Sequence, residues 1–231
     1  MIRAVIFDFN GVLVDDEMVH FSLFRDVLGA EGVVIDERRY HDDYLGYDDR
    51  GCFEHALADA GQSADAARLD ELVARKAGRY FAAAEVGLTY FPDAARVIGD
   101  LADRWPLAIY SGALRPEIEW ALGRLGVLDR FAAIVSAEDT TRCKPDPQGY
   151  LMARDALRAR DGLALADLDS GSCLVIEDSL AGIAAARGAG MKAIGVAQTY
   201  TAAELVGAGA DATIPGLASF TPGWVEQTFD R

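Results

Sequence analysis

The sequence is poor in lysine and has no long apolar run. Its 231 residues include only three lysines, Lys76, Lys144 and Lys192, and the formal net charge is −15. Such an acidic surface repels nucleic acid and anionic membranes, so we expect neither as a partner. No apolar stretch approaches the length of a membrane span. The first apolar run starts almost at Met1 and leaves no room for a signal peptide, so we expect a cytoplasmic protein.

Cysteine is also scarce. Cys52, Cys143 and Cys173 are widely spaced and odd in number, without the spacing of a metal site. We therefore expect free thiols that serve packing rather than chemistry. At this length, and with 51% hydrophobic residues, the chain can bury a substantial core as one large domain or two small ones. We expect a monomer or a weak dimer.

A buried strand is predicted at the start of the chain. Ala4–Phe7 is an apolar run without polar alternation, which is typical of a parallel-sheet strand covered on both faces. In open α/β sheets the ligand crevice lies at the carboxyl ends of the strands, which places the following residue, Asp8, in the site. Taken alone, Asp8 to Gly11 is more often an Asx-Gly turn that closes a strand.

The rest of the pattern separates a helical block from an alternating part. Residues 16–87 show only helical periods, whereas strands and helices alternate from 88 onward. Later strands are predicted at 107–110, 133–135, 173–176, 193–196 and 212–214. Helices are predicted at 17–30, 53–60, 64–85, 93–103, 116–125, 148–160, 180–187 and 202–206. This alternation predicts an α/β fold with a doubly wound parallel sheet, formed by residues 1–15 and 88–231, and an inserted helical domain, residues 16–87.

Polar residues recur at the carboxyl edge of this predicted sheet. In chain order they are Asp8, Ser111 with Gly112, the loop residue Lys144, and Glu177 with Asp178. Each alone fits a turn, a rigid loop or a solvated helix start. Their coincidence at the ends of the strands predicts one shared site.

Four motifs carry a resemblance to a known family. They are Phe7-Asp8-Phe9-Asn10-Gly11-Val12, Tyr110-Ser111-Gly112, Lys144-Pro145-Asp146-Pro147 and Ile176-Glu177-Asp178-Ser179. In their order and spacing the chain resembles the haloacid dehalogenase (HAD)-like hydrolase superfamily, in its phosphatase and β-phosphoglucomutase-like branch. The resemblance implies a Rossmann-like core with an inserted helical C1 cap.

The resemblance also implies roles for the residues of the motifs. Asp8 would be the nucleophile and would form an aspartyl-phosphate. Mg²⁺ would be held by Asp8, Asp178 and the main-chain carbonyl of Asn10, with Glu177 nearby or acting through water. The residues that bind the transferred phosphoryl group would be Ser111, the Gly112 amide and Lys144.

Charge balance agrees with this assignment. Several carboxylates and a phosphate dianion can share a pocket only if cations offset their charge. Mg²⁺, which prefers oxygen ligands, and the ammonium group of Lys144 would supply that offset. Lys144 is also expected to keep Asp8 ionised, because a nearby cation favours the carboxylate.

Position 10 departs from the family pattern. In the phosphatases this position holds a second aspartate, which protonates the leaving oxygen and later deprotonates water. Asn10 cannot transfer a proton at neutral pH, and such assistance is typically worth about 10²–10⁴-fold. Four explanations stay open: leaving groups that need no proton, such as acyl or aryl phosphates; a catalytically impaired binding or regulatory protein; an engineered substitution; and deamidation of Asn10-Gly11.

Other reactions of the superfamily fit less well. A dehalogenase needs no metal, and the acidic pair Glu177-Asp178 argues against it. A phosphonate hydrolase needs a cap lysine that forms a Schiff base, and Lys76 lies late in the cap. A phosphomutase must move protons at the position of Asn10. We therefore expect an Mg²⁺-dependent hydrolase of a small phosphorylated metabolite.

Three cap residues are candidate substrate contacts. Gly46-x-x-x-Arg50 resembles a substrate loop of sugar-phosphate members, in which Arg50 would bind a second anionic group. Alternatively, Arg50 pairs with the neighbouring acids Asp48 and Asp49. His20 and Lys76 fall where such members place polar cap contacts, although a hydrogen-bonded helix histidine and a solvated helix lysine are the alternatives.

Overall fold

The computed structural model describes residues 1–45 and 47–229, which form two compact units. The first unit combines Met1–Val14 with the chain from Tyr90 onward, and the second unit is Asp15–Thr89. Two strands that the sequence analysis did not predict, β2 (Val14–Asp15) and β3 (Thr89–Tyr90), pair with each other where the chain passes between the units. Each of these strands has only two residues, which is too short to show the periodicity on which the prediction of strands depends.

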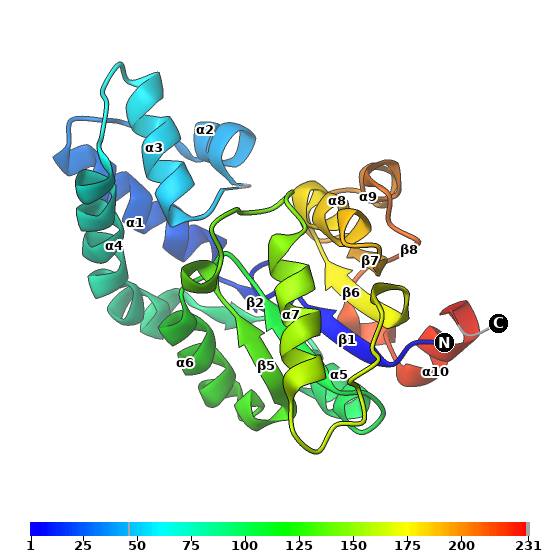
Figure 1. Ribbon diagram of the computed structural model, residues 1–231. Coiled ribbons are helices and arrows are strands. Elements are labelled where there is room, and N and C mark those ends of the chain that lie inside the picture. The colour runs from blue at the N-terminus through cyan, green and yellow to red at the C-terminus, as the bar shows by residue number, and fades with distance from the viewer. Residues whose placement is uncertain (46, 230–231) are drawn as a thin grey trace. The chain divides into compact units, whose positions relative to one another are not determined.

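The first unit is built on a six-stranded parallel sheet with the order β5–β4–β1–β6–β7–β8 (Figure 1). The strands are β1 (Ala4–Phe7), β4 (Leu107–Tyr110), β5 (Phe131–Val135), β6 (Cys173–Glu177), β7 (Lys192–Val196) and β8 (Ala212–Ile214). The predicted α/β fold with a parallel sheet is thereby confirmed. Each predicted strand is present, with ends that differ by at most two residues.

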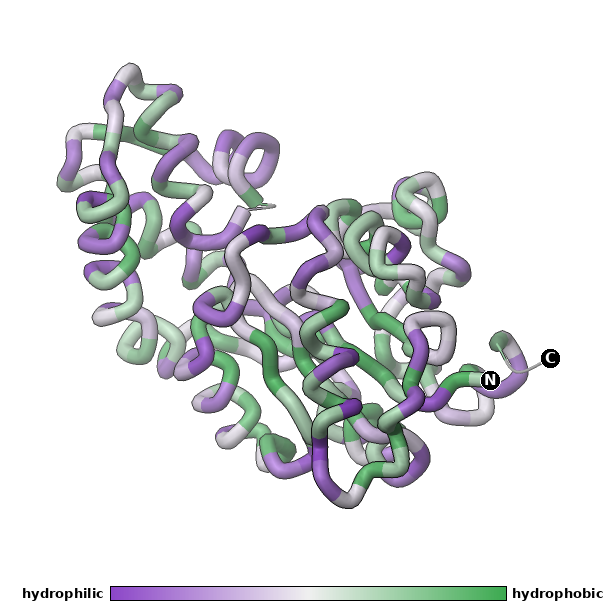
Figure 2. The backbone as a smooth tube through the Cα atoms, in the orientation of Figure 1, coloured by the Kyte–Doolittle hydropathy of each residue, from purple (hydrophilic) through white to green (hydrophobic). Residues whose placement is uncertain are grey.

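Strand β1 is buried on both faces, which explains its unbroken apolar sequence. Ala4 and Ile6 belong to a core cluster that includes residues of α7 (Gln148–Ala159) and α8 (Leu180–Gly188). Val5 and Phe7 alternate with them and are also fully buried. In Figure 2 the central strands are correspondingly hydrophobic along their length.

Helices connect successive strands of the sheet. They are α5 (Ala94–Ala102), α6 (Arg115–Leu125), α7, α8 and α9 (Ala202–Ala208), with the short turns η2 (Leu128–Arg130), η3 (Ala137–Asp139), η4 (Ser170–Ser172) and η5 (Leu217–Ser219). The chain continues into α10 (Pro222–Phe229), a helix that the sequence pattern does not predict. Helices α7, α8 and α9 pack against the sheet strands. None of the helices within residues 1–45 and 47–229 is both long and apolar enough to cross a membrane.

The second unit is helical. Its elements are α1 (Glu17–Ala30), α2 (Glu37–Arg39), η1 (Tyr40–Tyr44), α3 (Asp49–Asp59) and α4 (Ala66–Gly87), and they enclose a core of aromatic and aliphatic side chains. Helix α3 starts four residues earlier than the prediction at 53, because the Asp48 carboxylate accepts a hydrogen bond from the Gly51 amide at 2.8 Å and caps the helix.

The position of β1 locates the crevice of the sheet. From β1 the chain adds β4 on one side, and it later adds β6 on the other, so the order of the strands reverses at β1. In open α/β sheets ligands bind beyond the carboxyl ends of the strands at this switch point. The first unit therefore presents its crevice beyond Phe7, where Asp8 follows.

Candidate active site at the carboxyl edge of the sheet

Strand register brings the predicted polar residues to one level. Phe7 pairs with Ile109 on β4 and with Ile176 on β6, so Asp8 follows at the level where Glu177 ends β6. The Asp8 amide donates to the Ile176 carbonyl at 2.9 Å and extends the ladder by one residue. The polar side chains Asp8, Ser111, Glu177 and Asp178 are all buried. Buried polar groups are costly unless they are paired, so this edge is a specialised site.

Lys144 connects two of these carboxylates. Its Nζ lies 2.7 Å from Asp8 Oδ1 and 2.5 Å from Glu177 Oε1. The rings of Tyr110 and Tyr150 flank the ammonium group at 5.2 and 5.6 Å from their centroids. Burial disfavours the charged lysine, but the two carboxylates more than offset this effect and raise its pKa above the usual range. Lys144 is therefore a fixed cation at the edge of the sheet.

The acidic cluster carries more negative charge than Lys144 balances. Asp8, Glu177 and Asp178 each offer a carboxylate oxygen within 4.8 Å of the others. Burial raises the pKa of Asp8 to about 7, although Lys144 opposes this shift. Burial and the neighbouring Glu177 and Asp8 carboxylates raise the pKa of Asp178 well above its usual value. These shifts indicate a site that favours an additional cation.

Glu177 already has a donor for each of its acceptor positions. Its Oε1 accepts from Lys144 and from the Tyr150 hydroxyl at 3.2 Å. Its Oε2 accepts from the Ser179 amide at 2.7 Å and from the Ser179 hydroxyl at 2.9 Å. A carboxylate has about four lone-pair positions, so these four bonds saturate it. Glu177 thus fixes Lys144 and the start of α8.

The loop after β1 places Asn10 beside Ser111. The Ser111 hydroxyl donates to Asn10 Oδ1 at 3.1 Å and accepts from the Ala113 amide, also at 3.1 Å. Gly11 has φ +74°, a conformation that favours glycine, and a Cβ there would lie only 2.1 Å from Asp178 Oδ2. Gly11 therefore allows the β1 loop to pack directly against the Asp178 carboxylate.

Sequence reasoning missed two residues of this site, in the loop after β7. The Gln198 side-chain amide donates to the Gly11 carbonyl at 2.7 Å. The Thr199 hydroxyl hydrogen-bonds to Asp178 Oδ2. The rule about strand ends points to them only once the strand order is known, because β7 then neighbours β6 and is followed by polar residues. Gly112, predicted to bind phosphate through its amide, is exposed in the turn that precedes α6.

The candidate cap residues of the second unit lie in ion pairs and hydrogen bonds of their own. Lys76 is fully buried, so it is not a solvated helix lysine. Its Nζ lies 2.7 Å from His20 Nδ1 and 2.7 Å from Asp49 Oδ1. His20 Nε2 lies 3.1 Å from Asp16 Oδ2, which also accepts from the Tyr80 hydroxyl at 2.7 Å. Because an ammonium group can only donate, Nδ1 of His20 is the acceptor and Nε2 carries the hydrogen.

Arg50 does not pair with the neighbouring acids named in the sequence analysis. It forms an ion pair with Asp70 on α4, while Asp48 caps α3 and Asp49 binds Lys76. Gly46, the first residue of the Gly46-x-x-x-Arg50 motif, lies outside the described residues. Arg50 remains partly exposed, with 43% of its side chain accessible.

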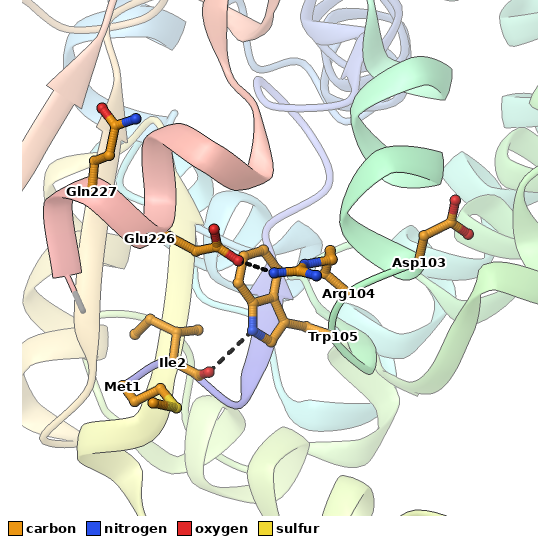
Figure 3. A pocket seen from close by; sticks show the side chains of 7 residues that line it. All are labelled: Met1, Ile2, Asp103, Arg104, Trp105, Glu226 and Gln227. Carbon is orange, nitrogen blue, oxygen red and sulfur yellow. Dashed lines mark hydrogen bonds and ion pairs between the residues drawn. The ribbon is translucent and has the colours of Figure 1, made fainter.

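A separate cavity of about 600 Å³ lies at the amino end of β1 (Figure 3). Several of its polar groups already have partners: Trp105 Nε1 donates to the Ile2 carbonyl at 3.0 Å, Arg104 pairs with Glu226, and Asp103 pairs with Arg130. Since Ile2 precedes β1 and Asp8 follows it, this cavity is remote from the acidic cluster. It is not part of the candidate active site.

The sheet order and the polar cluster at its switch point define a doubly wound α/β protein with its site at the carboxyl edge of the strands. A family model for haloacid dehalogenase-like hydrolases matches residues 2–190. The chain therefore belongs to the haloacid dehalogenase-like hydrolases.

Similar proteins place the chain within this family. It is 30% identical over 213 residues to validoxylamine A 7'-phosphate phosphatase of Streptomyces hygroscopicus subsp. limoneus, covering 89% of this chain and 90% of that protein. It is 30% identical over 203 residues to β-phosphoglucomutase of Bacillus subtilis (strain 168), covering 85% and 84%. The chain thus falls in the branch of phosphatases and β-phosphoglucomutase.

A solved structure of CbbY from Rhodobacter sphaeroides is similar over nearly the whole chain. It has a TM-score of 0.79 and 26% identity, and the match covers 95% of this chain and 96% of that one. That structure is of an aspartate-to-asparagine variant of CbbY in complex with xylulose-1,5-bisphosphate.

Proposed function

We propose that this protein is an Mg²⁺-dependent phosphatase that hydrolyses a small phosphorylated metabolite through an aspartyl-phosphate on Asp8. The observation that carries the proposal is the position of Lys144, whose ammonium group lies 2.7 Å from Asp8 Oδ1 inside an acidic cluster at the switch point of the sheet. A fixed cation beside a candidate nucleophile is what phosphoryl transfer requires, because this reaction depends on positioning and charge neutralisation.

The donor set fits Mg²⁺. Asp8, Asp178 and the main-chain carbonyl of Asn10 would hold it, since hard oxygen ligands suit this ion. Glu177 would contribute its charge or act through water, because its oxygens already accept four hydrogen bonds. When bound, Mg²⁺ neutralises negative charge on the phosphoryl oxygens.

The chain's own groups account for the proposed steps. An Asp8 carboxylate oxygen attacks phosphorus while the bond to the leaving oxygen breaks, and water then attacks the aspartyl-phosphate and releases phosphate. Lys144, the Ser111 hydroxyl and the Gly112 amide would bind the phosphoryl oxygens. The leaving oxygen must gain a proton in the first step and the water must lose one in the second, and Asn10 can do neither. We therefore expect the first step to be slow for alkyl phosphates and faster for acyl and aryl phosphates, whereas the second step, which all of them share, lacks its base in every case.

Restoring an acid at position 10 tests this proposal. The Asn10 side chain accepts a hydrogen bond from Ser111, and a carboxylate there can accept the same bond. With Mg²⁺ present, we expect Asn10→Asp to raise kcat/KM for alkyl phosphates by about 10²–10⁴-fold, the usual value of general acid–base assistance. The gain should be much smaller for aryl and acyl phosphates. Steady-state kinetics of both proteins on matched substrates measures it.

Asp8→Asn is the control for the nucleophile. It should abolish turnover of every substrate class in the Asn10→Asp background. Turnover that survives this change would argue against an aspartyl-phosphate on Asp8. If neither the wild type nor Asn10→Asp is active although both bind Mg²⁺, the protein is not a phosphatase.

The second candidate function is a catalytically impaired, metabolite-binding or regulatory protein. Asn10 favours it, because the amide removes proton transfer and leaves the main-chain carbonyl in place. In the related CbbY, an aspartate-to-asparagine variant is found in complex with a sugar bisphosphate. A binder would take up phosphorylated sugars with Mg²⁺ and gain no turnover in Asn10→Asp.

Two other reactions receive less support. A phosphonate hydrolase needs a neutral cap lysine as a nucleophile, whereas Lys76 is ion-paired with Asp49 and donates to His20. A phosphomutase needs proton transfer to and from sugar hydroxyls at position 10, which Asn10 cannot supply.

Substrate contacts of His20, Lys76 and Arg50 stay predictions, as do the roles of the second unit as a cap, a cytoplasmic location and a monomer or weak dimer. Lys76 uses two of its three donors on Asp49 and His20 and is fully buried, so it would have to become accessible before it could bind substrate. Arg50 is better placed to gain a ligand, because its partner Asp70 is itself 68% exposed.

A further inference from the structure

The loop between β7 and α9 is held firmly at both of its ends. At the start, the Ala197 amide donates to the Ile214 carbonyl at 2.8 Å and the Gln198 amide to the Val196 carbonyl at 2.9 Å. At the end, Thr201 caps α9 and exchanges hydrogen bonds with Glu204. Gln198 and Thr199, which lie in this short loop, are therefore presented by a fixed backbone.

Both of these residues are directed at the proposed metal site. The Thr199 hydroxyl hydrogen-bonds to Asp178 Oδ2, and the Gln198 side chain donates to the Gly11 carbonyl at 2.7 Å. The Asp178 carboxylate also packs against Gly11, where an added Cβ would lie 2.1 Å from Oδ2. One oxygen of Asp178 is thus enclosed between Thr199 and the Gly11 backbone.

We propose that Thr199 and Gln198 are positioning residues for Mg²⁺ in the site assigned under the proposed function, on which this inference rests. Thr199 fixes the rotation of the Asp178 carboxylate, which leaves its other oxygen to the metal. Gln198 fixes the main chain at Gly11, directly after the Asn10 carbonyl. Mg²⁺ demands nearly ideal octahedral geometry, so a carboxylate that rotates freely binds it less well. Partners of metal ligands are typically worth about 10–100-fold in metal affinity.

Removal of the Thr199 hydroxyl tests the assignment without any need for catalysis. Thr199→Val keeps nearly the same shape, and we expect its Kd for Mg²⁺ to rise by about 10–100-fold in calorimetric titration of the intact protein with MgCl₂. Thr199→Ser keeps the hydroxyl and should bind Mg²⁺ close to wild-type affinity. Thr201→Val is the matched control in the same loop. It removes the cap of α9 and lowers the Tm, but it should leave the Kd for Mg²⁺ unchanged.

The outcomes separate this inference from the proposed function. If Thr199→Val binds Mg²⁺ with the same affinity as the wild type, the inference is overturned and the proposed function is not. The same holds if Thr199→Ser or Thr201→Val loses as much Mg²⁺ affinity as Thr199→Val. Absence of Mg²⁺ binding to the wild type overturns both. If Thr199→Val does not fold, Gln198→Ala carries the test, because its contact is to a carbonyl and involves no carboxylate. Wild-type Mg²⁺ affinity in Gln198→Ala would then contradict the inference.

Discussion

At Asp8, opposing effects decide the charge of the proposed nucleophile. Burial is the largest and raises the pKa, Lys144 lowers it, and the Glu177 carboxylate raises it again, which leaves the pKa at about 7. From the sequence we expect Lys144 to keep Asp8 ionised. The ion pair does act in that direction, but burial outweighs it. Burial could not be judged from the sequence, because it arises from the packing of four separate strand ends.

The raised pKa of Asp8 predicts how the stability of the metal-free protein depends on pH. Between its ordinary value of 3.8 and about 7, the folded protein holds a proton on Asp8 that the unfolded chain releases. The stabilisation is complete below the unfolded pKa and is lost as the pH rises through about 7. In EDTA we therefore expect the Tm of the wild type to fall over this range, relative to that of Asp8→Asn. Parallel Tm curves for the two proteins would contradict this expectation.

Polar residues at the predicted strand ends identify some residues of the site and not others. This pattern pointed to Asp8, Lys144 and Glu177, and these side chains are in contact in the structure. It did not reach Thr199, because one hydroxyl among many polar loop residues carries no signal until the strand order is known. It also did not predict the pair of the buried Lys76 with the partly buried Asp49, since these residues are far apart along the chain and belong to different helices.

At the scale of the element, helix α8 depends on a glycine for a reason that helix propensity does not capture. Alanine is normally better than glycine inside a helix by about 1 kcal/mol. At Gly182, however, an added Cβ would lie 1.6 Å from Glu177 Oε1, so the Glu177 carboxylate occupies the space of the missing side chain. The first turn of α8 and the acidic cluster are therefore packed as one body.

A pair of glycine substitutions tests this packing. We expect Gly182→Ala to lower the Tm and to weaken phosphate and Mg²⁺ binding, because Glu177 must move and Lys144 loses one of its two carboxylate partners. The control is Gly123→Ala in α6, where nothing lies within 4 Å of the added Cβ. It should stabilise the protein by about 0.5–1 kcal/mol. Thermal denaturation of both variants gives the comparison, and a stabilising effect at both positions would refute the packing argument.

Elements with a strong period were predicted well, and short elements were not. The central strands and helices such as α1 and α7 follow from apolar runs and helical periods that extend over several residues. Strands β2 and β3 have two residues each, which is too short to show a period. Helix α10 lies in a segment whose sequence shows no clear helical period. The predicted start of α3 was wrong, because the N-cap at Asp48 determines where the helix begins, and the apolar pattern does not. Local capping and two-residue pairing thus limit what periodicity can show.

At the scale of the whole molecule, negative charge dominates. The chain carries a net charge of −15, and its acidic cluster concentrates three carboxylates around one lysine in the first unit. A general excess of surface charge is relieved by any salt, since exposed charges are screened over about 8–10 Å. A built cation site responds instead to one ion at low concentration. Screening of surface charge and specific cation binding can therefore be separated by titration with different salts.

Thermal denaturation in Mg²⁺ makes this separation. An ion that binds only the folded state stabilises it by about 2.7 kcal/mol at 100 times its Kd. For a chain of this size, that corresponds to a rise in Tm of roughly 5–10 °C. We expect this rise with MgCl₂ and a much smaller one with NaCl at equal ionic strength. In Asp178→Asn, the metal-free protein should be at least as stable as the wild type, because a buried carboxylate with a strongly raised pKa is removed. The specific effect of Mg²⁺ should vanish in that variant, whereas equal responses to both salts would show that screening alone stabilises the fold.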